Sequence, residues 1–97
     1  MKKLFVLCTM LLWVAINALA QQKISVSGIV TDENKEPVIG ANVTIKGQSI
    51  GTITDIDGRF IINAPANAIL RVTYIGYIPQ EIKVENKREL KIILQED

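Results

Sequence analysis

The stretch Gly51-Thr52-Ile53-Thr54-Asp55-Ile56-Asp57-Gly58-Arg59-Phe60-Ile61-Ile62 carries the strongest signal for the fold class. Both of its ends are rich in β-branched and aromatic residues, which favour extended chain. Asp57-Gly58 lies between them and is a turn signal. The stretch therefore predicts two strands, 50–54 and 59–62, joined as a hairpin that closes at Asp57-Gly58.

Apolar and polar residues largely alternate on both sides of this hairpin, as they do in half-buried strands. Turn-forming residues separate the alternating segments at intervals of roughly ten residues. Seven short strands, with no helix after the first twenty residues, predict an all-β fold, a seven-stranded antiparallel β-sandwich. The strands expected outside the hairpin are 24–31, 42–46, 69–75, 77–84 and 90–94.

The same alternation predicts which side chains face inward. We expect strand 69–75 to lie inside a sheet, whereas Pro79 cannot donate a backbone N–H and so predicts an edge or a bulge. A domain this small buries only about 60% of its unfolded surface, so the inward side chains must pack well. The expected core consists of Val43, Ile45, Phe60, Ile62, Leu70, Val72, Leu90 and Ile92.

The first twenty residues have the pattern of an export signal. Lys2 and Lys3 precede an apolar run that contains Cys8, and Ala18-Leu19-Ala20 has the small-x-small pattern that signal peptidases cleave. A transmembrane anchor is the alternative, but the apolar run stops short of the about 20 residues that span a bilayer. We therefore expect a signal peptide at 1–20 and a single exported domain at 21–97.

The composition of the expected domain argues against common enzyme chemistry. It has no cysteine, and the whole chain has no histidine, the usual group for proton transfer near neutral pH and the commonest metal ligand. The hydroxyls of Ser25, Ser27 and Ser49 have no base beside them in the sequence, so we expect no catalytic residue and no cofactor. Without Lys2 and Lys3, nine basic residues stand against ten acidic ones, which disfavours nucleic acid as a partner.

Three blocks of the sequence carry a family resemblance. They are Gly28-Ile29-Val30-Thr31-Asp32 with Pro37-Val38-Ile39-Gly40-Ala41-Asn42-Val43, the block 51–60 quoted above, and Tyr74-Ile75-Gly76-Tyr77. Together they resemble carboxypeptidase-regulatory-like domains, and the resemblance covers nearly all of 21–97. It implies an Ig-like or transthyretin-like sandwich.

The residues of these blocks are similar to those of the periplasmic N-terminal extension of SusC/RagA-like TonB-linked outer-membrane receptors. In Bacteroidetes-type bacteria such receptors import glycans or peptides. The resemblance implies a non-catalytic accessory domain in the periplasm or at the outer membrane, with receptor or TonB-system components as partners. In these receptors a TonB box, a plug and a barrel follow the extension, and we expect none of them after Leu94.

One position departs from the family pattern. Lys35 stands in the first loop, where family members often carry glycine. We expect Asn34 to supply the positive φ of that loop, because asparagine tolerates the left-handed region better than most residues.

Four residues form the candidate interaction surface. Asp55 and Asp57 resemble the start of a calcium loop or an acid–base pair, but Ile53 and Ala64 stand where further calcium ligands belong, so a plain turn is favoured. Tyr74 and Tyr77 offer aromatic faces for a sugar ring; we expect Tyr74 in the core and Tyr77 over a sheet edge. A small secreted carbohydrate-binding module is the alternative function. Strand addition at the sandwich margins is a further mode of binding.

Overall fold

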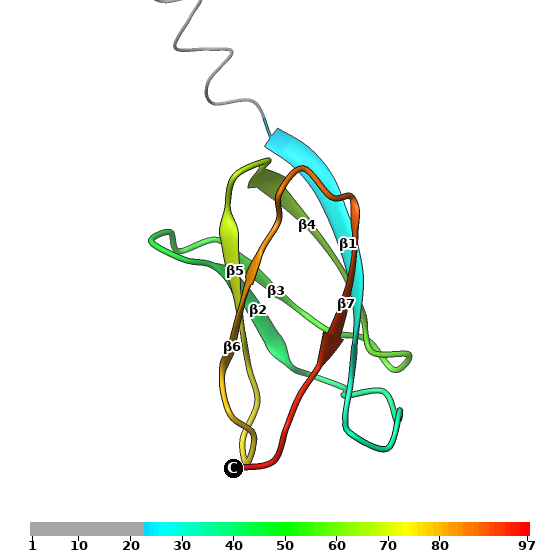
Figure 1. The fold of residues 1–97 in the computed structure, drawn as a ribbon. Coiled ribbons are helices and arrows are strands. Elements are labelled where there is room, and N and C mark those ends of the chain that lie inside the picture. Colours follow the sequence, from blue (N-terminus) through cyan, green and yellow to red (C-terminus); the bar gives the residue numbers. More distant parts are fainter. Residues whose placement is uncertain (1–22) are drawn as a thin grey trace, which may run out of the picture.

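The computed structural model describes residues 23–97, which form two β-sheets packed face to face (Figure 1). One sheet has the strand order β4-β1-β7 and the other has the order β3-β2-β5-β6. The all-β sandwich expected from the sequence is confirmed, whereas the signal peptide expected at 1–20 lies outside the described residues. The strands are β1 (Lys23–Thr31), β2 (Asn42–Ile45), β3 (Gly51–Ile53), β4 (Arg59–Pro65), β5 (Ile69–Thr73), β6 (Gln80–Lys83) and β7 (Glu89–Ile93).

One strand pair differs from the antiparallel expectation. β7 pairs with β1 in parallel, with Gly28 opposite Leu90 and Val30 opposite Ile92, while the other strand pairs are antiparallel. The chain reaches this arrangement because it enters β7 after crossing from the second sheet back to the first. β5 lies inside its sheet and β6, which follows Pro79, lies at its edge, as the sequence predicted.

The hairpin predicted for 50–62 is wrong in its pairing. The chain does turn at Asp57-Gly58, but β3 pairs with β2 and β4 pairs with β1, so the two strands belong to different sheets. A turn signal predicts a change of direction and does not name the partner of either strand. The turn therefore carries the chain from one layer of the sandwich to the other.

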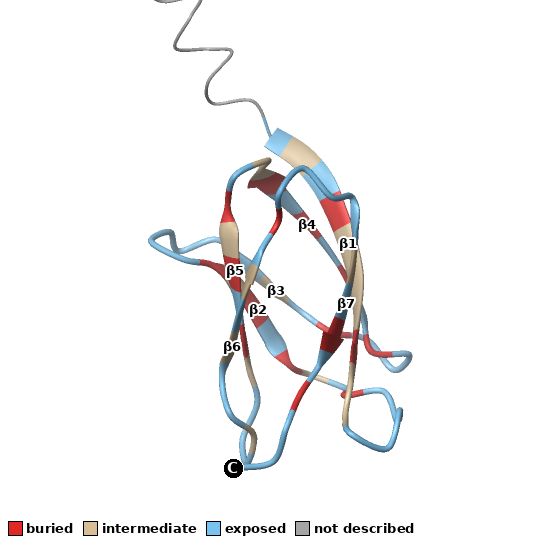
Figure 2. Ribbon diagram, in the orientation of Figure 1, coloured by how far each residue is buried: buried red, intermediate tan, exposed pale blue. Residues whose placement is uncertain are grey.

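The core lies between the two sheets, where buried side chains alternate with exposed ones along the strands (Figure 2). Seven of the eight predicted core residues are buried; Leu90, on edge strand β7, is only partly buried and packs against the others. The buried apolar side chains that the core prediction omitted are Val26, Val30, Val38, Ala41, Ala64, Ala68, Val84 and Leu94.

Gly28 leaves room in the core for an aromatic ring. It lies opposite Phe60 on β4, and a Cβ atom at Gly28 would stand 2.5 Å from two carbon atoms of the Phe60 ring. Phe60 is 3% exposed, so the ring fills the space that a side chain on β1 would otherwise take. The glycine in this strand is required by the close approach of its neighbour.

Thr54 connects the two loops through which the chain first changes sheets. Its hydroxyl donates to the Val38 carbonyl over 2.6 Å and accepts the Ala41 N–H over 2.9 Å. Its backbone N–H donates to Ala41, and its carbonyl accepts the N–H of Gly40. Thr54 is the buried polar side chain among the described residues, and all its hydrogen-bonding groups have partners.

The two loops that follow β1 and β3 have the same hydrogen-bond pattern. In loop 32–36 the Asp32 carboxylate accepts two backbone N–H groups, those of the residues two and four positions later. In loop 55–59 the Asp55 carboxylate does the same. In each loop the aspartate N–H donates to the carbonyl four residues later, and its carbonyl accepts the N–H three residues later.

The fourth position of both loops has a positive φ, and this corrects the expectation for Asn34. Gly58 has φ +74° in the second loop, and Lys35 has φ +64° in the first. Asn34 is not among the positive-φ residues of 23–97, and its N–H is bonded to Asp32 Oδ1. The hydrogen bonds to the aspartate fix which loop residue must have a positive φ. This residue is Lys35, although Asn34 beside it tolerates a positive φ better.

The role of Thr54 is tested by replacing it with valine. Thr54→Val keeps the shape and leaves the Ala41 N–H and the Val38 carbonyl without this partner, so the free energy of unfolding should fall by about 1–3 kcal/mol. Thr54→Ser keeps the hydroxyl and should lose about 1 kcal/mol or less, the value of one methyl group. Urea denaturation measures both. Equal losses in the two variants would show that the hydroxyl contributes no more than the methyl group, which would contradict its assigned role.

A glycine at position 35 should stabilise the protein. The left-handed conformation costs a residue with a Cβ atom roughly 1–2 kcal/mol, and glycine avoids this cost. Glycine also has more conformational entropy in the unfolded state, which offsets part of the stabilisation. Lys35→Gly should therefore raise the free energy of unfolding by about 0.5–1 kcal/mol in the same denaturation experiment. Lys87→Gly, at an exposed turn position outside the positive-φ set, is the control and should not stabilise. A destabilised Lys35→Gly variant would contradict the assigned strain.

Candidate interaction surface

Tyr74 and Tyr77 lie at the two ends of one turn, in the reverse of the arrangement predicted for them. Tyr74 is 40% exposed, whereas Tyr77 is partly buried and packs against the core. Their ring centroids are 5.9 Å apart with an interplanar angle of 45°. The expectation of a buried Tyr74 is wrong because β5 ends at Thr73, so the alternation of the strand does not extend to it.

The chain's last residues hold this turn in place. The N–H of Ile78 donates to the Gln95 carbonyl and the N–H of Asp97 donates to the Gly76 carbonyl, over 2.9 and 3.1 Å. Within the turn, the Tyr77 N–H donates to the Tyr74 carbonyl, and Gly76 supplies a φ of +89°. We call residues 74–78 the tyrosine turn.

The tyrosine turn presents apolar side chains to solvent. Ile75 is 94% exposed, and Ile78 and Tyr74 are each about 40% exposed. A single exposed isoleucine is common on protein surfaces, but three large apolar side chains on one turn form a small patch. The patch is held by backbone hydrogen bonds on both flanks, so ordering it on contact with a partner costs little conformational entropy.

Acidic residues lie around the Tyr77 hydroxyl. Burial raises the pKa of Tyr77 above its ordinary value of 10.0, and the negative charges of Asp32, Glu96 and Glu33, together with Tyr74, raise this pKa further. Backbone pairing supports this placement, because Tyr77 forms an isolated β-bridge with Glu96. The apolar patch therefore has an acidic border.

Asp55 and Asp57 lie on the crossing loop between β3 and β4. Asp55 Oδ1 accepts the N–H groups of Asp57 and Arg59, each over 2.9 Å, which is the plain-turn role that the sequence predicted. Between Asp55 and Asp57, the side chain of Ile56 is 75% exposed. Within 23–97 no group of three or more histidine, cysteine, aspartate or glutamate residues is placed to hold a metal ion.

The four candidate residues therefore form two separate pairs. Figure 1 shows the crossing loop 55–58 and the tyrosine turn apart from each other, the latter beside the C-terminus. The structure brings Tyr74 to Tyr77 and Asp55 to Asp57, and it does not join the two pairs into one surface.

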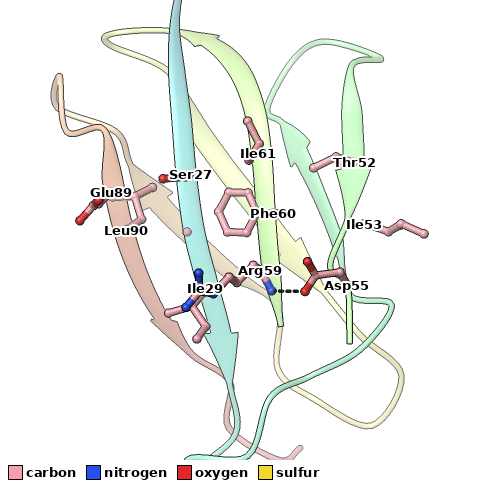
Figure 3. Close-up of a pocket in the computed structure, with 11 residues that line it drawn as sticks. Ser27, Ile29, Thr52, Ile53, Asp55, Arg59, Phe60, Ile61, Glu89 and Leu90 are labelled. Atoms are coloured by element: carbon pink, nitrogen blue, oxygen red, sulfur yellow. Dashed lines mark hydrogen bonds between the residues drawn. The ribbon is translucent and has the colours of Figure 1, made fainter. Parts of the chain in front are cut away.

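Sequence reasoning missed a shallow groove of about 660 Å³ beside β3 and β4 (Figure 3). Residues of β1, β3, β4 and β7 line it, and the exposed side chains of Ile53 and Ile61 flank it. No sequence signal could have found this groove, because its lining residues come from four strands that meet only in the folded sandwich.

Comparison with protein families matches residues 26–97 to the CarboxypepD_reg-like domain. The chain belongs to this family. The resemblance carried by the three sequence blocks is thereby confirmed, and the match covers six of the seven strands completely together with most of β1.

Among curated proteins, the chain is similar to TonB-dependent receptors. It is 49% identical over 86 residues to TonB-dependent receptor SusC of Bacteroides thetaiotaomicron, covering 89% of this chain and 8% of that receptor. It is 39% identical over 94 residues to TonB-dependent receptor P3 of Formosa agariphila, covering 95% of this chain and 9% of that receptor. The chain thus spans less than a tenth of the length of these relatives.

Among solved structures, the chain resembles a chain of a type II cohesin–X–dockerin complex from Acetivibrio cellulolyticus. The TM-score is 0.61 with 25% identity, covering 74% of this chain and 57% of that chain. A second mutant of the same complex matches with a TM-score of 0.58 and 23% identity. These likenesses support the fold. No helix within residues 23–97 has the length and apolarity needed to cross a membrane.

The raised pKa of Tyr77 predicts how stability changes at alkaline pH. A pKa raised by folding means that the folded state favours the neutral phenol, so this contribution to stability is complete below pH 10.0 and is lost as pH rises through the folded-state value. In a Tyr74→Phe variant, ultraviolet titration of the remaining tyrosine should give a midpoint above pH 10.0. Adding Asp32→Asn should lower that midpoint, whereas adding Asp57→Asn should not. An unchanged midpoint with Asp32→Asn would contradict the assigned electrostatics.

Proposed function

We propose that this protein is an exported, non-catalytic accessory domain of a TonB-dependent nutrient-receptor system. The observation that carries the proposal is the 49% identity with TonB-dependent receptor SusC over nearly the whole chain. Conserved fold alone would not give a function, but identity at this level over one domain supports a shared role for that domain.

The tyrosine turn is the proposed contact surface. It combines an exposed apolar patch, an acidic border and a backbone fixed by the chain's last residues. Such a patch is suited to a protein partner that offers an apolar pocket with basic residues at its rim, because complementary charge guides association and apolar contact stabilises it. The proposed partners are receptor or TonB-system components.

The proposed location is the periplasm, in association with the outer membrane. The lysines, the apolar run and the Ala18-Leu19-Ala20 site support a cleavable export signal at 1–20 followed by one domain at 21–97. The absence of cysteine after Ala20 means that the domain folds without a disulfide in an oxidising compartment.

A carbohydrate-binding role is the competing proposal from the sequence. Stacking on a sugar ring needs an accessible aromatic face. Tyr77 is partly covered and its ring is tilted by 45° to that of Tyr74, so the two rings do not form one flat platform. The tyrosine turn therefore favours a protein partner over a glycan.

The proposal is tested by capture from outer-membrane and periplasmic extracts of Bacteroides thetaiotaomicron, with the purified chain as bait. Mass spectrometry should find a TonB-dependent receptor or TonB-system component enriched at least tenfold, and Ile75→Asp should abolish the enrichment. Ile56→Asp is the matched control, since it places the same charge on a largely exposed isoleucine of the other turn and should retain the partner.

Three other results would overturn the proposal or part of it. Retention with Ile75→Asp and loss with Ile56→Asp would move the contact surface to the crossing loop. Binding to a glycan array without any protein partner would favour the carbohydrate-binding module. A folded bait that captures no receptor or TonB-system component would contradict the accessory role.

A further inference from the structure

Among residues 23–97, the outer edge of β4 carries backbone groups without partners. The Val30 N–H donates to the Gly58 carbonyl over 2.7 Å, so in this antiparallel ladder the even-numbered residues of β4 bond to β1. The odd-numbered residues point their N–H and carbonyl groups away from β1. This places the backbone groups of Ile61 and Asn63 at the free edge of the sheet.

Both ends of this edge are closed by the protein itself. At one end, the Arg59 carbonyl accepts the backbone N–H of Asp55, and the Arg59 N–H donates to the Asp55 carboxylate. At the other end the Pro65 carbonyl accepts the N–H of Ala68. Within residues 23–97, Ile61 and Asn63 have no backbone partner on this side, so they form a short open segment between two closed ends.

The two layers of the sandwich are unequal at this edge. The sheet that contains β4 has three strands and the facing sheet has four. β3 lies at the edge next to β4, and none of its three residues is buried, with Ile53 62% exposed. A fourth strand beside β4 would cover β3 and make the layers equal.

One side of the groove described above lies at this edge, where residues of β3 and β4 line it, and further lining residues belong to β1 and β7. Ile61, which is 69% exposed, and Ile53 flank it, and Phe60 and Thr52 contribute to its lining (Figure 3). An extended chain bonded to the β4 edge would place alternate side chains in the groove. Branched apolar side chains would fit this lining best.

Charge favours a foreign acidic segment over a second copy of the chain. Arg59 is exposed at one end of this edge, beside Asp55, whose Oδ1 accepts two backbone N–H groups, and Lys23 of β1 is exposed opposite Pro65 at the other end; neither cation forms an ion pair within the described residues. Suppose that β4 paired antiparallel with β4 of a second copy, with Ile62 opposite Ile62. Arg59 of each copy would then lie opposite Pro65 of the other copy, next to the Lys23 that pairs with this Pro65. Like charges would then approach at both ends, whereas an acidic residue there would be attracted.

We propose that the free edge of β4 binds an extended polypeptide segment that has branched apolar residues at alternating positions and acidic residues at its ends. The segment adds a fourth strand to the sheet, bonds to Ile61 and Asn63, and covers the groove. This surface is separate from the tyrosine turn, so its test does not depend on the proposed function.

The probe is the blocked peptide DVTVTVD, whose two terminal aspartates place an acid at both ends of the edge in either strand direction. In ¹⁵N NMR titration of the chain, the amide signals of Ile61 and Asn63 should shift, and their hydrogen exchange should slow at least tenfold. The amide of Ile62 should keep its exchange rate, since it already bonds to β1. The charge-reversed peptide KVTVTVK should bind at least tenfold more weakly.

Two variants separate edge pairing from general loss of structure. Asn63→Pro removes an outward N–H without touching the ladder to β1 and should weaken peptide binding at least tenfold. Lys91→Pro makes the same change at the opposite edge of the same sheet, on β7, and should leave binding unchanged. Ile61→Lys keeps the backbone N–H but blocks the groove, so it should also weaken binding. This variant tests the site even if Asn63→Pro does not fold.

The proposal is overturned by any of three results. The first is an absence of shifts on β4 at saturating peptide. The second is an equal response at β7. The third is a concentration-dependent shift of Ile61 and Asn63 without peptide, which would identify a second copy of the chain as the occupant.

Discussion

The buried hydroxyl of Thr54 is the interaction on which the sandwich most depends. A two-layer fold needs the chain to change layers, and each change exposes backbone groups that no sheet ladder can satisfy. Here one side chain serves both of the first two crossings, because Thr54 bonds to Val38 and Ala41 while leading into the loop that starts at Asp55. The two crossings are therefore joined to each other.

In loops 32–36 and 55–59, too, one side chain satisfies several backbone groups. An aspartate at the first position satisfies two backbone N–H groups, and this fixes which residue must adopt a positive φ. In one loop that residue is Gly58 and in the other it is Lys35. The hydrogen bonds of the loop thus outweigh the conformational preference of the residue, at the cost of local strain.

The sequence predicted the local properties of this fold well and its pairings less well. Alternation identified the strands and seven buried residues because the pleat fixes which side chains share a face. It could not show that β3 and β4 belong to different sheets, or that β7 joins β1 in parallel, because these depend on contacts between distant segments. For the same reason it paired Asp55 with the tyrosines, which the structure separates, and missed the groove beside β4.

The parallel pair formed by β1 and β7 has a mechanical consequence. These are the first and last strands of the described chain, and because they run in the same direction the two ends of the domain leave at opposite ends of the sandwich (Figure 1). A pulling force applied between Lys23 and Asp97 would load the ladder between them in shear, with its hydrogen bonds sharing the force instead of opening one at a time. This geometry resists a force along the length of the domain better than a force that peels β7 away from β1.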